Sequence, residues 1–262
     1  MQRKAVFFDI DGTLWDEDFV IPDSTSEAIR KLRENGHYAF ICSGRSRAFI
    51  IGENLFAVGF DGIVAGCGTM VEVNGEVPFY HRLDEKLVRR VAYLMRENQI
   101  PAIMEGRYYL YADMGPFKDD PFAIRVKENI GKGLLDLESH LDDMEVSKFS
   151  ISMPNDNYLK VMPELEEYFT PLEHEDRCIE FVPKGFSKAT GIAKTCELLE
   201  IRREDTYAFG DSVNDVDMLK YVAHGIVMGN GTPVAKEAGD YITTPLHEDG
   251  IYNGLKHFEL IS

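Results

Sequence analysis

The feature that most constrains this chain is an apolar run that ends in two aspartates. Ala5-Val6-Phe7-Phe8 is followed at once by Asp9-Ile10-Asp11-Gly12-Thr13. Such a run is typical of a buried parallel strand, because both faces of that strand are covered. The glycine lets the backbone turn sharply, and ligand sites of open α/β sheets lie at the edge where strands end in this way. We therefore expect Asp9 and Asp11 to face one crevice, where a cation would relieve their repulsion; an Asp-rich turn without chemistry is the alternative.

The segments that follow alternate between helical and strand patterns. Ser24 and Glu27 have the spacing of a capping box at the start of a helix. Strand patterns at residues 37–42 and 62–65 enclose a helical pattern at about residues 46–57. This order predicts a doubly wound, mostly parallel α/β core sheet of the Rossmann-like kind. Asn74-Gly75 then predicts a hairpin turn.

The pattern changes between residues 83 and 183 and predicts a separate α+β domain there. Helical patterns near residues 84–98, 121–129 and 157–169 are mixed with an aromatic segment at 108–111 and strand patterns at 148–153 and 178–182. The βα alternation resumes afterwards, with a helix at 188–200 and strands at 206–210, 225–228 and 241–243. We therefore expect a core domain of residues 1–82 and 184–262, interrupted by an inserted cap of residues 83–183.

A second acidic cluster follows another predicted strand. Gly210-Asp211-Ser212-Val213-Asn214-Asp215 comes after Tyr207-Ala208-Phe209 and opens a helix. Because parallel strands end at one edge of a sheet, this cluster is expected to meet Asp9 and Asp11. Clustered carboxylate oxygens suit Mg²⁺, which typically binds one or two carboxylates together with substrate phosphate. For Asp215, a first-turn acid that complements the helix dipole is the alternative.

Two further elements predict an anion at the same edge. Ser43-Gly44 follows the second strand and offers a hydroxyl and a backbone N–H near a helix start, although Ser43 is also suited to be only a helix cap. Lys188, at another helix start, offers a positive charge, with a solvated surface lysine as the alternative.

These blocks resemble, in order and spacing, the four motifs of the haloacid dehalogenase superfamily. The matching blocks are DIDGT at 9–13, SGR at 43–45, Lys188 within GFSKATGI, and GDSVND at 210–215. The inserted segment is similar to the large cap of the Cof-type sugar-phosphatase branch, between the second and third motifs. MGNGTPVAKEAGDYIT at 228–243 and EDGIYNGL at 248–255 extend the resemblance over essentially the whole chain. Ser43 stands where threonine is commoner, which preserves the hydroxyl.

The resemblance implies a role for each of these residues. Asp9 would be the nucleophile that forms an aspartyl-phosphate, and Asp11 would protonate the leaving group and then activate water. Mg²⁺ would be held by the Asp9 and Asp211 side chains and the Asp11 carbonyl. The phosphoryl oxygens would be bound by four groups: Ser43, the Gly44 N–H, Lys188 and Asn214. Asp215 would orient Lys188 or a metal-bound water, whereas Arg45, Trp15 and Asp16 are expected to have packing or surface roles.

The predicted function is therefore a Mg²⁺-dependent phosphatase that acts on small phosphorylated metabolites. The resemblance alone favours hexose or pentose phosphates; pyridoxal phosphate, flavin mononucleotide and a phosphosugar mutase of the same superfamily stay open. A phosphoaspartate receiver fits poorly, because receivers lack a cap. Candidate substrate contacts in the cap, with packing or solvent exposure as their alternative, are Glu105, Arg107, Tyr109 and Lys148.

Composition limits the partners and the compartment. The formal net charge of −17 disfavours nucleic acid and anionic membranes, which bind to basic clusters. No apolar stretch is long enough to cross a bilayer, and no obligate protein partner is evident. The four cysteines are scattered, without a CxxC pair, and the chain runs directly from Met1 into its first strand. We therefore expect a cytoplasmic protein whose partner is a small phosphorylated metabolite.

Overall fold

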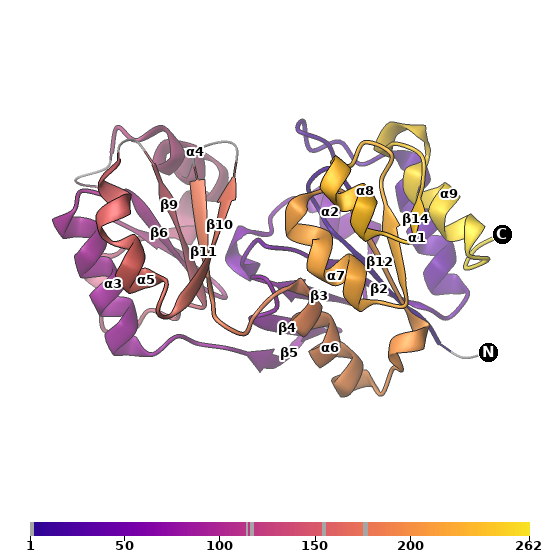
Figure 1. The fold of residues 1–262 in the computed structure, drawn as a ribbon, viewed down its shortest axis with the longest axis horizontal. Helices are drawn as coiled ribbons and strands as arrows, with labels where there is room; N and C mark the ends of the chain where they lie inside the picture. The colour runs from indigo at the N-terminus through magenta and orange to yellow at the C-terminus, as the bar shows by residue number, and fades with distance from the viewer. Residues whose placement is uncertain (1–2, 114, 116–117, 154–155, 175–177) are drawn as a thin grey trace. The chain divides into compact units, whose positions relative to one another are not determined.

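The computed structural model describes residues 3–113, 115, 118–153, 156–174 and 178–262, and these fall into two units (Figure 1). The first unit comprises residues 1–44, 52–79 and 187–262, and the second comprises residues 45–51 and 80–186. The second unit thus includes residues 45–51, which lie outside the predicted cap. The predicted boundaries of core and cap remain a prediction.

The first unit is built on a sheet that has, among the described residues, the strand order β14-β13-β12-β1-β2-β3-β4-β5. The strands from β14 to β3 are parallel, and β4 is antiparallel to β3. The mostly parallel core that the sequence predicts is thereby confirmed. The strands of this sheet are β1 (Ala5–Phe8), β2 (Tyr38–Cys42), β3 (Gly62–Ala65), β4 (Met70–Val73), β5 (Glu76–Tyr80), β12 (Thr206–Gly210), β13 (His224–Val227) and β14 (Tyr241–Ile242).

Helices cover both faces of this sheet, which is why its central strands are apolar throughout. On one face, α6 (Lys188–Leu199), α7 (Val216–Tyr221) and α8 (Pro233–Ala238) pack on a core that includes Phe7 and Phe40. On the other face, α9 (Gly250–His257) lies so close to Phe209 that a Cβ at Gly254 would be 2.6 Å from its ring. The first helix, α1 (Asp23–Glu34), packs beside α9.

Two local predictions, at Ser24 and at residues 46–57, are wrong. Ser24 does not cap a helix: α1 begins at Asp23, after Pro22, and Ser24 lies inside the first turn. Pro22 is the residue before the helix, so the start lies two residues before the one that the capping pattern predicts. The single helix expected at residues 46–57 is instead a 3₁₀ turn (Arg47–Phe49) and the short α2 (Glu53–Val58), because Gly52 has a φ of +119° that no helix accommodates.

The hairpin prediction is confirmed. Asn74 and Gly75, between β4 and β5, have φ values of +51° and +82°. Two successive residues with positive φ form the two-residue turn that suits the twist of a hairpin.

The second unit contains a sheet with the strand order β10-β11-β9-β6-β7-β8 among the described residues. The pairs are antiparallel except for β7 with β8. Its strands are β6 (Ala102–Glu105), β7 (Leu110–Ala112), β8 (Leu134–Asp136), β9 (Lys148–Ser152), β10 (Phe169–His174) and β11 (Cys178–Pro183). Its helices are α3 (Glu85–Glu97), α4 (Pro121–Ile130) and α5 (Met162–Leu165).

The two faces of this sheet have separate apolar cores. Phe149 and Phe181 stack on each other and pack with residues of α3 and α5. Ile103 and Leu110 pack with Val126 of α4. The predicted helix at residues 157–169 is wrong: it is a 3₁₀ turn (Asp156–Lys160) followed by the four-residue α5, and Phe169 already belongs to β10.

Candidate active site

The first unit brings the two acidic clusters together at the carboxyl edge of its sheet. Asp9 follows β1 and Asp211 follows β12, and these strands are parallel neighbours with Phe8 paired to Phe209. One carboxylate oxygen from each of Asp9, Asp211 and Asp215 lies within 4.8 Å of the others. Residues about two hundred positions apart in sequence therefore share one site.

Lys188 lies between two of these aspartates. It is the first residue of α6, which Ser187 and Thr190 begin with a reciprocal capping box. Its ammonium donates to Asp9 Oδ1 at 2.6 Å and to Asp215 Oδ1 at 2.5 Å, and lies 3.4 Å from Asn214 Oδ1. Only 1% of Lys188 is exposed, so it is not a solvated surface lysine.

Asp215 holds the second acidic loop in place as well as the lysine. Its other oxygen, Oδ2, accepts hydrogen bonds from the backbone N–H groups of Asp211 and Ser212 at 2.9 and 3.0 Å. Its side chain is fully buried. Asp215 therefore connects the start of α6 to the loop after β12 and fixes both relative to Asp9.

Two residues outside the predicted set hold Asp211 and the loop after Asp11 in place. Thr13, which is buried, donates its hydroxyl to Asp211 Oδ1 at 2.9 Å. Asn230 donates its side-chain amide to the carbonyl of Gly12 at 2.8 Å. Gly12 itself has a φ of +80°, and a Cβ there would lie 2.5 Å from Asp211 Oδ2. Thr13 and Asn230 both lie inside quoted sequence blocks, DIDGT and MGNGTP, which was the available signal for them.

The remaining predicted residues lie in the same unit. Ser43 and Gly44 follow β2, which is the parallel neighbour of β1, and Ser43 is buried. The Asp11 side chain is exposed and accepts a hydrogen bond from the indole of Trp15. Three of the four predicted blocks therefore follow the adjacent strands β12, β1 and β2, and the fourth contains Lys188 at the start of α6.

Burial and crowding shift the pKa values of the carboxyl groups upward. Burial, and then the neighbouring Asp215, raise the pKa of Asp9 well above its ordinary value, against the opposing effect of Lys188. The same two causes raise the pKa of Asp211 to about 7. Burial lowers the pKa of Lys188, but Asp215 and Asp9 outweigh it and leave that pKa above its ordinary value. The lysine stays charged, and the two carboxyl groups hold their protons more tightly than an exposed aspartate does.

This arrangement fits a bound cation. The cluster has more carboxylates than Lys188 can neutralise, and crowded acids with raised pKa values are stabilised by a positive ion. The donor atoms that face one another are oxygens only, which suits a hard cation rather than one that prefers nitrogen or sulfur. The group of Asp9, Asp211 and Asp215 could therefore hold a metal ion.

A family model described as haloacid dehalogenase-like hydrolase matches residues 6–255. The chain belongs to this family. The haloacid dehalogenase resemblance seen in the four sequence blocks is thereby confirmed.

Several relatives of this haloacid dehalogenase-like hydrolase are phosphatases by name. It is 34% identical to "Putative phosphatase YkrA" of Bacillus subtilis, over 100% of both chains. It is 27% identical to the 5-amino-6-(5-phospho-D-ribitylamino)uracil phosphatase YcsE of Bacillus subtilis, over 98% of this chain and 96% of that one. Among solved structures it is similar to the subclass IIB sugar phosphatase BT4131, with 28% identity and a TM-score of 0.82, over 98% and 100% of the two chains. These comparisons place the hydrolase among the phosphatases of its superfamily.

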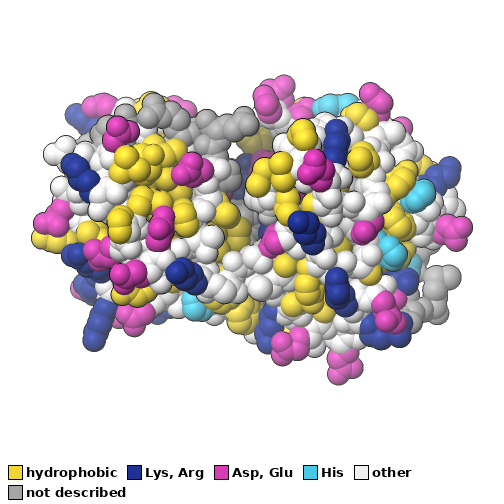
Figure 2. Space-filling model, viewed as in Figure 1, with side chains coloured by type: hydrophobic (Ala, Val, Ile, Leu, Met, Phe, Trp, Pro, Cys, Tyr) yellow, Lys and Arg dark blue, Asp and Glu magenta, His cyan; other side chains and the backbone are white. Residues whose placement is uncertain are grey.

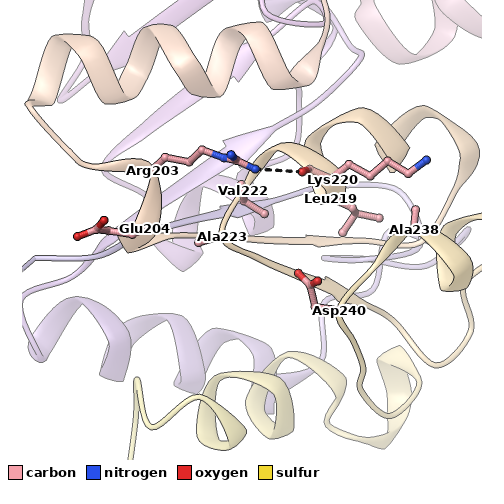
Figure 3. A pocket seen from close by; sticks show the side chains of 8 residues that line it. All are labelled: Arg203, Glu204, Leu219, Lys220, Val222, Ala223, Ala238 and Asp240. Carbon is pink, nitrogen blue, oxygen red and sulfur yellow. Dashed lines mark hydrogen bonds between the residues drawn. The ribbon is translucent and has the colours of Figure 1, made fainter.

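The first unit of the hydrolase also has a cavity of about 600 Å³ at the opposite edge of its sheet, where strands β12, β13 and β14 begin (Figure 3). None of the predicted site residues lines it. Arg203 donates to the carbonyls of Lys220 and Tyr221, and Asp240 accepts from the N–H of Gly225. The charged groups of this cavity thus form hydrogen bonds with backbone groups near the starts of these strands.

On the face drawn in Figure 2, lysines and arginines are scattered among acidic side chains, without a broad basic patch. Among the described residues, no helix combines the length and the apolar character that a membrane span requires.

Proposed function

We propose that this hydrolase cleaves phosphate monoesters of small metabolites with Mg²⁺, through an aspartyl-phosphate at Asp9. The observation that carries the proposal is the buried ammonium of Lys188, held by Asp9 and Asp215 beside Asp211. A phosphoryl group needs positive charge on its oxygens and a nucleophile in line with the leaving group. The site supplies the Lys188 ammonium as a fixed positive charge, and this ammonium orients the Asp9 carboxylate.

Asp9 and Asp11 have different parts in the proposed reaction. The Asp9 carboxylate attacks phosphorus, the phosphorus–oxygen bond to the leaving group breaks, and Asp11 gives its proton to the departing alkoxide. Asp11 then takes a proton from water, which attacks phosphorus, releases phosphate and restores the Asp9 carboxylate. The burial of Asp9 and the exposure of Asp11 support this division, because the proton carrier must reach the leaving group and water.

Four groups bind the transferring phosphoryl oxygens in this proposal: Ser43, the Gly44 N–H, Lys188 and Asn214. Asn214 Oδ1 faces the Lys188 ammonium and the Ser212 hydroxyl, which leaves its amide NH₂ to donate toward a phosphoryl oxygen. Fixed donors of this kind are effective because they need no reorganisation as charge develops. Asp215 is a positioning residue for Lys188.

The metal would be Mg²⁺, held by the side chains of Asp9 and Asp211 and the main-chain carbonyl of Asp11. When bound, Mg²⁺ supplies positive charge that lowers the repulsion between the phosphoryl group and the carboxylates. Thr13 fixes the orientation of Asp211, and Asn230 fixes the Gly12 carbonyl in the same loop. The oxygen-only donor set supports this assignment.

For the substrate we propose sugar phosphates or related polyol phosphates, chosen by residues 83–183. The solved relative is a sugar phosphatase, and the relative YcsE acts on a phosphorylated ribitylamino compound. All eight predicted site residues lie in the first unit, so discrimination among substrates is left to the other. Pyridoxal phosphate, flavin mononucleotide and a mutase reaction are the competing assignments. We also propose a cytoplasmic location, since all four cysteines are buried thiols.

The test is a screen of phosphate release from a panel of phosphate monoesters, with and without Mg²⁺. Release should stop in EDTA and return with Mg²⁺. Asp9→Asn should abolish it, and Asp11→Asn should reduce it by at least about 10²-fold. Conversion of a sugar phosphate to its isomer without phosphate release would establish the mutase instead, and full activity of metal-stripped enzyme would exclude the metal.

A further inference from the structure

The side-chain amide of Asn214 is held at its oxygen, whereas its nitrogen has no protein partner. Asn214 Oδ1 accepts a hydrogen bond from the hydroxyl of Ser212 at 2.7 Å and faces the Lys188 ammonium at 3.4 Å. Among the described residues, no group accepts a hydrogen bond from the NH₂ group of this amide. The half-buried amide therefore has two donors at one end and two unused N–H bonds at the other.

The chemistry of the ammonium decides which end of the amide faces Lys188. An ammonium can only donate hydrogen bonds, so an amide nitrogen turned toward it would place two donors against each other. Lys188 is held in position, because it is 1% exposed and also donates to Asp9 and Asp215. Oδ1 therefore faces the ammonium. Since this oxygen can only accept, the serine hydroxyl must be the donor in the bond between Ser212 and Asn214.

Backbone hydrogen bonds fix the position of Ser212 itself. Its N–H donates to Asp215 Oδ2 at 3.0 Å, and the N–H of Asp215 donates to the Ser212 carbonyl at 3.1 Å. The Ser212 hydroxyl also lies 3.3 Å from Asp215 Oδ2, but a hydroxyl has one proton, and its 2.7 Å contact with Asn214 is the shorter of the two. The backbone bonds do not involve the hydroxyl, so they remain when the hydroxyl alone is removed.

We propose that Ser212 is a positioning residue for Asn214, and that its hydroxyl keeps the amide NH₂ group directed at the transferring phosphoryl group. The proposal rests on the proposed function, in which Asn214 binds a phosphoryl oxygen. Lys188 holds the amide less tightly than Ser212 does, because its ammonium lies closer to the carboxylates of Asp9 and Asp215 than to Asn214. A donor that is fixed in advance stabilises developing charge without reorganisation.

The test is a double-mutant cycle of Ser212→Ala and Asn214→Ala. Two quantities are measured: kcat/KM for the best sugar phosphate of the panel and for p-nitrophenyl phosphate, per folded molecule, and the inhibition constant of inorganic phosphate. The inhibition constant does not depend on how much of the protein is folded. Because the phosphoryl group is common to both esters and to inorganic phosphate, the loss should not depend on the leaving group.

We expect Ser212→Ala to lower kcat/KM about tenfold for both esters, a part of the roughly 10²-fold loss expected of Asn214→Ala, which removes the donor itself. The inhibition constant of inorganic phosphate should rise about threefold, as for one neutral hydrogen bond. Added to Asn214→Ala, Ser212→Ala should change kcat/KM by less than about twofold, because its effect passes through the amide. Ser212→Thr keeps the hydroxyl and suits the extended backbone there, so it should restore activity. Ser139→Ala, the control, removes a hydroxyl that donates to Asp136 at 2.7 Å in the second unit and should change neither quantity.

Three results would overturn the proposal: normal kinetics in Ser212→Ala, the same loss in Ser212→Thr as in Ser212→Ala, or an undiminished further loss when Ser212→Ala is added to Asn214→Ala. The single variant Asn214→Ala separates these failures from failure of the proposed function. If Asn214→Ala lowers kcat/KM and Ser212→Ala does not, only the positioning role is wrong. If Asn214→Ala leaves both quantities unchanged, Asn214 does not bind the phosphoryl group, and the proposed function is wrong at this residue.

Discussion

Each unit of the molecule buries one lysine between two carboxylates, and the two clusters are built differently. Lys188 lies at a helix start, beside loops at the carboxyl edge of a parallel sheet. Lys148 lies within an antiparallel sheet, on β9, opposite Glu105 of β6 and beside Glu180 of β11. Its ammonium is 2.5 Å from Glu180 and 3.6 Å from Glu105. Both lysines are 1% exposed.

The difference lies in the surrounding charge and backbone. Around Lys188 the acids Asp9, Asp211 and Asp215 gather with Asp11 nearby, and glycines such as Gly12 allow backbone to approach them closely. Around Lys148 the carboxylates belong to regular strands, and the hydroxyl of Ser150 bonds Glu105. A buried ion pair by itself is weak evidence of function, since such pairs also tie strands together. The excess of carboxylates over positive charges at the ends of the parallel strands is therefore the feature that indicates a functional site around Lys188.

The largest expected effect comes from removing each lysine. Lys188→Met should lower kcat for every phosphate ester, acetyl phosphate included, by at least about 10³-fold, because the phosphoryl oxygens lose a fixed positive charge. Lys148→Met should cost about 3 kcal/mol of unfolding free energy, since it removes the ammonium that lies beside the buried carboxylate of Glu105. Per folded molecule, the Lys148 variant should hydrolyse acetyl phosphate at the normal rate. Denaturant unfolding and steady-state assays of both variants check this.

An equal loss of acetyl phosphate hydrolysis in the two variants would contradict the distinction between a catalytic cluster at Lys188 and a structural cluster at Lys148. It would mean that the second unit supplies a group to the chemistry. A loss confined to particular sugar phosphates would instead make Lys148 part of substrate selection.

The next effect concerns the pH dependence of metal binding. The pKa of Asp211 is raised to about 7 without metal, so below that pH its carboxyl group holds a proton that a cation must displace. The apparent affinity for Mg²⁺ should therefore fall with decreasing pH below about 7, by up to about tenfold per pH unit for each proton released. Above that pH the contribution of Asp211 to this pH dependence should level off.

Calorimetric titration in buffers of different ionisation heat measures both the affinity and the protons released. Asp211→Asn is the control, because it removes the titrating group and should weaken binding at every pH. Binding of constant affinity across this range, without proton release, would contradict the crowded acidic site.

The smallest expected effect comes from removing two hydroxyl groups, each of which donates a hydrogen bond to a carboxylate. Thr13 donates to Asp211 in the first unit, and Ser150 donates to Glu105 in the second. Thr13→Val should weaken Mg²⁺ binding about tenfold, as is typical when a residue that orients a metal ligand is lost. Ser150→Ala should cost about 1 kcal/mol of stability and leave Mg²⁺ binding unchanged. Equal effects of both on metal affinity would remove the distinction between the clusters.

The sequence predicted the first unit well because its signals are local. An apolar run followed by acids at 9–11, and again at 211–215, fixes a strand and its loop within a few residues, and adjacency in a parallel sheet brings them together. Lys188 at a helix start was predictable for the same reason.

Features that depend on distant packing could not be read from the sequence. The antiparallel strands of the second unit are short and pair across many residues, so segments such as Leu110–Ala112 and Leu134–Asp136 left little pattern. The bond from Trp15 to Asp11 arises from the folding of one loop onto itself. The helical pattern at residues 46–57 gave no warning of the break at Gly52.

The central claim is that the Asp9 carboxylate carries the phosphoryl group. The most direct test is acid quenching of the enzyme during turnover, followed by borohydride reduction and mass spectrometry of the peptide that contains residues 5–13. The account predicts homoserine at position 9, more of it in Asp11→Asn, where hydrolysis of the intermediate is slowed, and none in Asp9→Asn. An unmodified Asp9 in Asp11→Asn, with the phosphoryl group on another residue, would contradict it.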